Sequence, residues 1–187
     1  MYKLCKTEQS AQRQKQLEQG LLKMMKHHHF EEISVSELCD RMGLPRKFFY
    51  RYFSSKDGAL LALLDHTMMT FYETGNMEGL QNGNHYEELV RFFRFWKEHA
   101  DLLDALRRSN LSGLLVERAI GIAKQEDLMP GYVKNWEATR QDLAMNFVVC
   151  GLLSLVLQWH KEGYRIPVEQ MTDVAMTMLT RPLVTDR

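Results

Sequence analysis

The chain has few of the residues that end helices or turn hairpins. Among its 187 residues are only four prolines, and its one Asn-Gly pair, Asn82-Gly83, lies between two stretches with helical spacing. Leu, Met, Ala and Glu together outnumber Val, Ile and Thr, which are the residues that strands favour. The composition therefore predicts an all-α fold.

Cysteine is also scarce, and its spacing argues against metal or disulfide chemistry. Cys5, Cys39 and Cys150 are odd in number, far apart and form no CxxC pair. This pattern supports neither a disulfide framework nor a structural zinc site, and it fits a reducing, cytoplasmic setting. The run from His27 to His29 is no better as a site, because neighbouring helical residues point about 100° apart. We expect no metal and no cofactor.

The sequence lacks the short motifs of common enzymes. It contains no G-x-S-x-G, no Gly-rich phosphate loop and no HExxH. An enzyme reading would have to rest on Glu98-His99 and on the cluster His160 to Glu162 as acid and base, but partly exposed helix ends explain both. We therefore expect a protein that is not an enzyme.

Signals for export or membrane insertion are weak. The amino terminus, MYKLCKTEQSAQRQKQ, is too polar for a signal peptide. Leu143 to Trp159 has no charged residue, but these 17 residues are at the lower limit for a span and include Asn146 and Gln158. A helix buried between subunits is the favoured interpretation, with no membrane partner.

A formal net charge of zero hides an uneven distribution. Residues 1–56 carry 11 Lys and Arg against 6 Asp and Glu, a net charge of +5, whereas residues 57–187 carry 13 against 18, a net charge of −5. A basic first third attached to an acidic remainder predicts a DNA-facing module joined to a body that does not face DNA. The boundary is expected at residue 56.

The stretch from Ile33 to Leu61 has the pattern of two short helices joined by a tight turn. Ser34 and Glu37 form a capping box that starts a helix at Val35, Gly43 ends it in a left-handed conformation, and Pro45 precedes the next helix. Helices this short cannot fold alone, and a pair joined by a turn containing Gly is the helix-turn-helix pattern. The second helix is rich in Arg, Lys and Tyr, which suit phosphates and base edges.

The rest of the chain also shows helical spacing. An amphipathic helix over residues 10–27 should pack on the motif, and Ser54 or Ser55 should begin a linking helix that runs to about residue 74. Further helices are expected over residues 86–99, 100–108, 111–125, 133–162 and 168–180, with residues 75–84 as a loop. The plan is three helices followed by six.

The run ISVSELCDRMGLPRKFFYRYFSSKDGAL resembles the amino-terminal domain of the TetR family of bacterial transcriptional regulators. The resemblance is specific over residues 21–64 and looser over the body. It implies an all-α homodimer with a three-helix helix-turn-helix domain, residues 1–56, and a six-helix ligand-binding and dimerisation domain, residues 57–187. Phe49 and Phe53 match buried core positions of the family.

By the same resemblance, Tyr50 and Lys56 stand at phosphate-contacting positions, Tyr52 near the DNA backbone, and Ser36 where the preceding helix touches phosphate. Arg46 and Lys47 open the recognition helix, where long cations commonly bond guanine. Phe48 replaces a small residue, so either it packs on a thymine methyl or this contact is absent. The predicted DNA-binding residues are Ser36, Arg46, Lys47, Phe48, Tyr50, Arg51, Tyr52 and Lys56.

The predicted function is a ligand-responsive repressor that binds a palindromic operator as a homodimer and is released by a small molecule. The alternative is a helical adaptor for another protein, which would need neither the cations of the recognition helix nor the charge split. Candidate residues for the effector pocket are Met68, Tyr72, Phe92, Trp96, Leu103, Leu114, Asn146 and Cys150. Candidate residues for the dimer interface are Leu152, Leu155, Trp159, Met171, Val174 and Met178.

Overall fold

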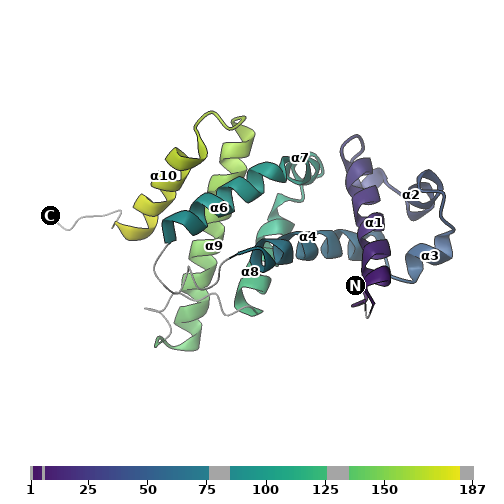
Figure 1. The fold of residues 1–187 in the computed structure, drawn as a ribbon, viewed down its shortest axis with the longest axis horizontal. Coiled ribbons are helices and arrows are strands. Elements are labelled where there is room, and N and C mark those ends of the chain that lie inside the picture. Colours follow the sequence, from purple (N-terminus) through teal and green to yellow (C-terminus); the bar gives the residue numbers. More distant parts are fainter. Residues whose placement is uncertain (1, 6, 76–84, 126–134, 182–187) are drawn as a thin grey trace. The chain divides into compact units, whose positions relative to one another are not determined.

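A computed structural model describes residues 2–5, 7–75, 85–125 and 135–181, and helices account for most of them (Figure 1). The described residues form nine α-helices and one short 3-10 helix, which confirms the all-α prediction. In chain order they are α1 (Glu8–Met25), η1 (Phe30–Glu32), α2 (Val35–Arg41), α3 (Arg46–Tyr50), α4 (Lys56–Glu73), α6 (His85–Glu98), α7 (Ala100–Arg108), α8 (Ser112–Gln125), α9 (Ala138–Lys161) and α10 (Val168–Thr180).

Side-chain caps fix where three of the amino-terminal helices begin. Thr7 Oγ1 accepts from Ser10 N and starts α1 two residues before the predicted position. Ser34 Oγ accepts from Glu37 N at 3.1 Å, as predicted, and Ser55 Oγ accepts from Gly58 N at 3.1 Å. The Glu37 carboxylate lies 3.5 Å from the Arg41 guanidinium, so the helix start depends on the Ser34 half of the predicted box.

Glycines end two helices in a left-handed conformation, which the sequence predicts for Gly43. Gly43 has φ +65° after α2, and Gly163 has φ +69° after α9. Residues with a Cβ rarely adopt this left-handed region, so both positions favour glycine. The start of α9 was predicted too early: the helix begins at Ala138, because residues 135–137 adopt turn, bend and extended conformations and Glu137 occupies the cap position.

The chain divides into two compact units. Unit 1 comprises residues 1–68 and 101–118, and unit 2 comprises residues 69–100 and 119–187. Compactness therefore groups the early part of α4, most of α7 and the first half of α8 with the helix-turn-helix. The functional boundary predicted at residue 56 is a different division, because it follows charge and motif.

Each unit has its own apolar core. In unit 1 the fully buried side chains include Leu17 and Leu21 of α1, Leu38 of α2 and the predicted core residues Phe49 and Phe53. In unit 2, α6 packs on α9 and α10. Its core is aromatic: the Phe93 and Trp159 rings meet edge to face, and Arg91 lies over Phe71 while bonding to its carbonyl oxygen.

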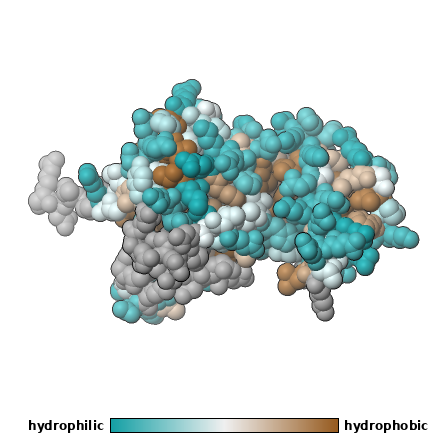
Figure 2. All heavy atoms as spheres, viewed as in Figure 1, coloured by the Kyte–Doolittle hydropathy of each residue, from teal (hydrophilic) through white to brown (hydrophobic). Residues whose placement is uncertain are grey.

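Hydrophobic residues interrupt the mainly hydrophilic surface in several places (Figure 2). On α9, Leu143 and Phe147 are 64% and 69% exposed, and on α10 Val174, Met178 and Leu179 are exposed. Among the described residues, only α9 is long and apolar enough to cross a membrane, and 22% of its most apolar window is buried. Length and composition are weak grounds for a span, because a helix that lies between subunits passes the same test.

Candidate DNA-binding surface

The helix-turn-helix consists of α2, the turn around Gly43 and α3. Leu44 N donates to Cys39 O at 2.9 Å and Gly43 N to Asp40 O at 3.1 Å, so backbone hydrogen bonds close the turn. Pro45 occupies the cap position of α3 with φ −69°, which its ring sets in advance. Phe49 is fully buried and orients α3, so Arg46, Lys47 and Tyr50 of this short helix are left exposed to solvent.

Four of the predicted DNA-binding residues gather on the exposed side of α3 and its end. Arg46, Lys47, Tyr50 and Arg51 are exposed, and the three cations have no hydrogen bond or ion pair with any other described residue. Ser36 lies half-buried in the first turn of α2. A cluster of unpaired cations with a tyrosine hydroxyl can bind phosphate oxygens and the acceptor edge of guanine.

Phe48 and Tyr52 form a pair behind this surface. Their rings meet edge to face at 5.5 Å, and Tyr52 is only 3% exposed, with a buried hydroxyl that has no partner among the described residues. The position of Tyr52 was predicted to lie near the DNA backbone, but its ring belongs to the core of unit 1. Phe48 is partly exposed, so its part in base contact stays a prediction.

Lys56, one of the predicted phosphate-binding residues, also binds backbone carbonyl groups of the protein. Its ammonium donates to Phe30 O and to Glu31 O, and it lies 4.3 Å from the centre of the Phe30 ring. Burial lowers the pKa of Lys56, although Asp57 and Glu31 oppose that effect. An ammonium has three donors, so one remains for a phosphate oxygen. The structure adds an anchoring contact between α4 and η1 to the predicted role.

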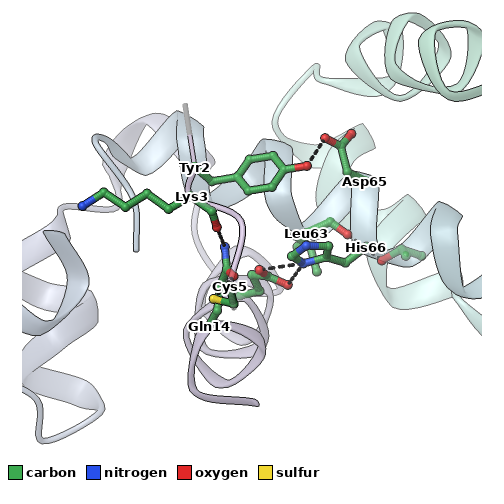
Figure 3. A network of polar contacts seen from close by, with 9 residues as sticks. Tyr2, Lys3, Cys5, Gln14, Leu63, Asp65 and His66 are labelled. Carbon is green, nitrogen blue, oxygen red and sulfur yellow. Dashed lines mark hydrogen bonds and ion pairs between the residues drawn. The ribbon is translucent and has the colours of Figure 1, made fainter. Parts of the chain in front are cut away.

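A buried ion pair joins α4 to α8 within unit 1. Asp65 is 4% exposed, and both of its carboxylate oxygens accept from Arg118, at 2.8 Å from Nε and 2.5 Å from Nη2. Tyr2 Oη also donates to Asp65 Oδ2 at 2.7 Å, as Figure 3 shows. The bond to Asp65 raises the pKa of Arg118 above its usual range, and burial raises the pKa of Tyr2. Sequence reasoning missed these residues, although a lone carboxylate in the run LLALLDHTMM was a signal for a buried partner.

A second polar contact joins α4 to α1. His66 Nδ1 lies 3.0 Å from Glu18 Oε1, and Glu18 is only 1% exposed. This hydrogen bond raises the pKa of His66, so the imidazolium form is favoured beside the carboxylate. Glu18 is buried although it is a carboxylate, because His66 supplies a partner.

The eight predicted effector-pocket residues do not gather in one unit. Met68, Leu103 and Leu114 belong to unit 1, and Tyr72, Phe92, Trp96, Asn146 and Cys150 belong to unit 2. Met68, Trp96 and Leu103 are buried, and the other five are partly exposed. Asn146 differs from the rest because its Oδ1 is buried and has no hydrogen-bond partner in the described part of the chain.

A groove of about 730 Å³ lies between α1 and α2, and none of those eight residues lines it. Its apolar floor includes Met24, Leu38 and Met42, and Lys15 and Arg41 are among its polar residues. Gly20 lies on this side of α1, where an added Cβ would come within 2.4 Å of Met42 Sδ. The groove is thus partly a consequence of the close packing of α1 on α2.

The residues predicted for the dimer interface differ in exposure. Trp159 and Met171 are buried within the subunit, and Trp159 Nε1 donates to Ile166 O at 2.9 Å. Val174 and Met178 are exposed on α10, and Leu152 and Leu155 are partly exposed on α9. The apolar surface that a second copy could cover also includes Leu143 and Phe147, which the sequence prediction left out.

Comparison with known sequences supports the reading of the amino-terminal module. Residues 20–63 match the sequence model described as "Bacterial regulatory proteins, tetR family". The match spans the last third of α1, then α2, α3 and the first half of α4, so it covers the module just described. A search of curated proteins found no significant match.

Solved structures share the fold over most of the chain. The fatty acid degradation regulator FadR from Bacillus halodurans has a TM-score of 0.60 at 16% identity, covering 96% of this chain and 98% of that one. The dihydroxyacetone kinase operon activator DhaS has a TM-score of 0.57 at 16% identity, covering 89% and 93%. A TetR-family transcriptional regulator from Streptomyces coelicolor has a TM-score of 0.51 at 21% identity, covering 88% and 78%.

At these identities the likeness to the solved structures establishes the fold, whereas the sequence match establishes the module. The exposed cations of α3 lie inside the matched residues, as a DNA-reading helix requires. Residues 20–63 therefore match the module of the tetR family of bacterial regulatory proteins, and the chain shares its overall fold with solved transcriptional regulators.

Proposed function

We propose that the protein is a ligand-controlled repressor that binds a palindromic operator as a homodimer. The observation that carries the proposal is the set of unpaired, exposed cations on α3, held outward by the buried Phe49. Cations without internal partners contribute little to the stability of the fold and are available for DNA phosphates and bases. Arg46 and Lys47 would read bases, and Tyr50, Arg51 and Lys56 would bind the backbone.

A two-fold symmetric dimer would read two half-sites of the operator. Recognition helices of such dimers enter successive major grooves, so the half-sites should be centred about 34 Å apart or a multiple of that distance. The operator should therefore be a palindrome. The charge difference supports this arrangement, because the basic residues 1–56 would face DNA while the acidic residues 57–187 would not.

The exposed apolar residues of α9 and α10 supply the proposed dimer surface. Leu143 and Phe147 on α9 and Val174, Met178 and Leu179 on α10 are all at least 40% exposed in the single chain. Apolar side chains this large gain free energy when a second copy covers them. Trp159 and Met171 are left out of the proposed surface because they already lie inside the subunit.

Release from DNA would follow when a small apolar or amphipathic effector binds in the body, residues 57–187. Asn146 supports a ligand that carries a hydrogen-bond donor, because its buried Oδ1 has no partner in the part of the chain that the structure describes. The effector need only prefer the DNA-incompetent state by about 1 to 3 kcal/mol to change occupancy of the operator.

The direction of regulation is proposed as repression, although the structural relative DhaS is described as an operon activator. A reporter fused to the protein's own upstream region distinguishes the two directions. Repression requires that reporter expression rise when the gene for the protein is deleted. A fall in expression would overturn the repressor proposal and leave DNA binding intact.

Gel-shift and genomic-selection experiments test DNA binding itself. We expect a palindromic site, binding that weakens steeply with salt, and loss of selectivity at one base pair in Arg46→Ala. Phe147→Glu places a charge on the proposed dimer surface and should convert a dimer to a monomer in light scattering. Absence of any specific, salt-sensitive complex would overturn the proposed function, and an unchanged dimer in Phe147→Glu would overturn the proposed interface.

A further inference from the structure

The described residues that precede α1 run beside the end of the recognition helix. Tyr2 pairs with Phe53 in an antiparallel bridge, and Lys3 N donates to Tyr52 O at 3.0 Å. On its other side, Lys3 O accepts from Gln14 Nε2 of α1 at 3.3 Å. Both backbone polar groups of Lys3 are therefore bonded, and the segment is held against the residues that directly follow α3.

Tyr2 anchors this segment through its side chain. Its hydroxyl donates to Asp65, whose carboxylate also binds Arg118, and its ring lies edge-on to the His66 ring at 5.5 Å. Burial raises the pKa of Tyr2, which keeps the hydroxyl protonated and able to donate to the carboxylate. The segment is thus tied to α4 and α8 at one residue and to the end of α3 at the next.

Lys3 points away from this anchor. Successive side chains of an extended segment lie on opposite sides, so an inward Tyr2 leaves Lys3 directed outward. Figure 3 shows the Lys3 side chain running away from Tyr2 and Asp65. Lys3 is exposed and forms no ion pair with the other described residues. Its backbone bond is to Tyr52, which directly follows Tyr50 and Arg51 in the chain, the residues proposed to lie along the DNA backbone.

We propose that Lys3 is a further phosphate-binding residue of the DNA complex and that Tyr2, held by Asp65 and Arg118, positions it. The inference rests on the proposed DNA binding and adds a contact from outside the helix-turn-helix. A lysine on a segment that is already ordered loses less conformational entropy on binding than one on a free arm. The contact carries charge but no base information, so it strengthens binding to every operator alike.

The test is a salt titration of operator binding by fluorescence anisotropy, using full-length protein without an amino-terminal tag and the site found by genomic selection. One phosphate contact per subunit contributes about 0.9 to the slope of log K against log salt, and at about 0.1 M salt this corresponds to roughly eightfold in affinity. Lys3→Ala should lose this slope contribution and this affinity for each subunit, and Lys3→Arg should restore the slope. Lys161→Ala, which removes the same charge from the exposed end of α9, is the matched control and should bind like wild type.

A double-mutant cycle tests the positioning role of Tyr2. Tyr2→Phe keeps the ring but removes the bond to Asp65, so it should weaken binding when Lys3 is present and have no further effect in Lys3→Ala. Additive effects would overturn the positioning role. A wild-type protein that binds no operator would overturn the proposed function and this contact together, whereas wild-type-like binding and slope in Lys3→Ala would overturn the Lys3 contact alone.

Discussion

The buried carboxylate of Asp65 makes Arg118→Met a demanding test of the structure. Asp65 is 4% exposed, and Arg118 supplies two of the three hydrogen bonds that it accepts. Breaking a fully buried pair from one side costs about 3 to 5 kcal/mol, because a charge remains without its partner. The Arg118 side chain is 36% exposed, so water can replace part of the lost bonds. We therefore expect the free energy of unfolding to fall by about 2 to 3 kcal/mol.

The assay is urea unfolding followed by far-ultraviolet circular dichroism at pH 7. Arg107→Met is the matched control, because Arg107 pairs with Asp104 at 3.1 Å but both side chains are about half exposed. That surface pair should change stability by less than about 0.5 kcal/mol. Asp65→Asn, combined with Arg118→Met, removes the stranded charge while keeping the side-chain shape. The double variant should therefore be more stable than Arg118→Met alone by at least about 1 kcal/mol.

The expected loss of stability depends on the burial of the Asp65 carboxylate, which is 4% exposed. A loss below about 0.5 kcal/mol in Arg118→Met would mean that solvent satisfies Asp65 without help from the protein. Equal stability of Arg118→Met with and without Asp65→Asn would mean that Arg118→Met leaves no destabilising charge at Asp65. Either result would refute the buried pair as an element that holds α4 to α8.

Three further predictions concern single side chains of unit 1. Lys56→Ala should weaken operator binding alike for all sequences and flatten the slope of log K against log salt by about 0.9 per subunit. It should also lower the free energy of unfolding, measured in urea, by about 1 to 2 kcal/mol, because two carbonyl groups lose a charged donor. Arg46→Ala should reduce discrimination at one base pair by about 1 to 3 kcal/mol in a binding selection, with stability unchanged. The pKa of His66 is raised in the folded protein, so its imidazolium form stabilises the fold fully at pH values below the unfolded pKa of about 6.5. The free energy of unfolding should therefore fall as the pH rises through the folded pKa. Unfolding measurements between about pH 6 and pH 8 should show this decline in the wild type and not in His66→Gln.

The helices could be predicted closely because local signals determine their ends. Ser34 accepts the Glu37 amide of the predicted capping box, and Ser55 is one of the two serines expected to begin the linking helix. Gly43 and Gly163 adopt the left-handed conformation that ends a helix. Each of these signals operates within a few residues, so the sequence alone contains it. The exposed cations of α3 were predictable for the same reason, since Phe49 and Phe53 determine which side of the motif faces inward.

The polar contacts between helices could not be predicted in this way. Tyr2 and Arg118 meet Asp65 across 63 and 53 residues of sequence, and no local pattern says which cation or hydroxyl will reach a buried carboxylate. The burial of Glu18 was unpredictable for the same reason, because helical periodicity cannot anticipate the partner that His66 provides. The sequence signal was present only as an anomaly: a single acidic residue in the apolar run of α4.

These contacts constrain how a signal could pass through unit 1. An effector that moved α4 alone would break the Asp65 to Arg118 pair. The expected cost of about 2 to 3 kcal/mol is as large as the upper part of the range of typical allosteric coupling energies, about 1 to 3 kcal/mol. We therefore predict that α4 and the first half of α8 move as one body, and that Tyr2 moves with them. Amide hydrogen exchange should give residues 59–68 and 112–118 a common opening free energy in the wild-type protein. Arg118→Met should separate the two values, and helices that already open independently in the wild type would show that the pair does not link them.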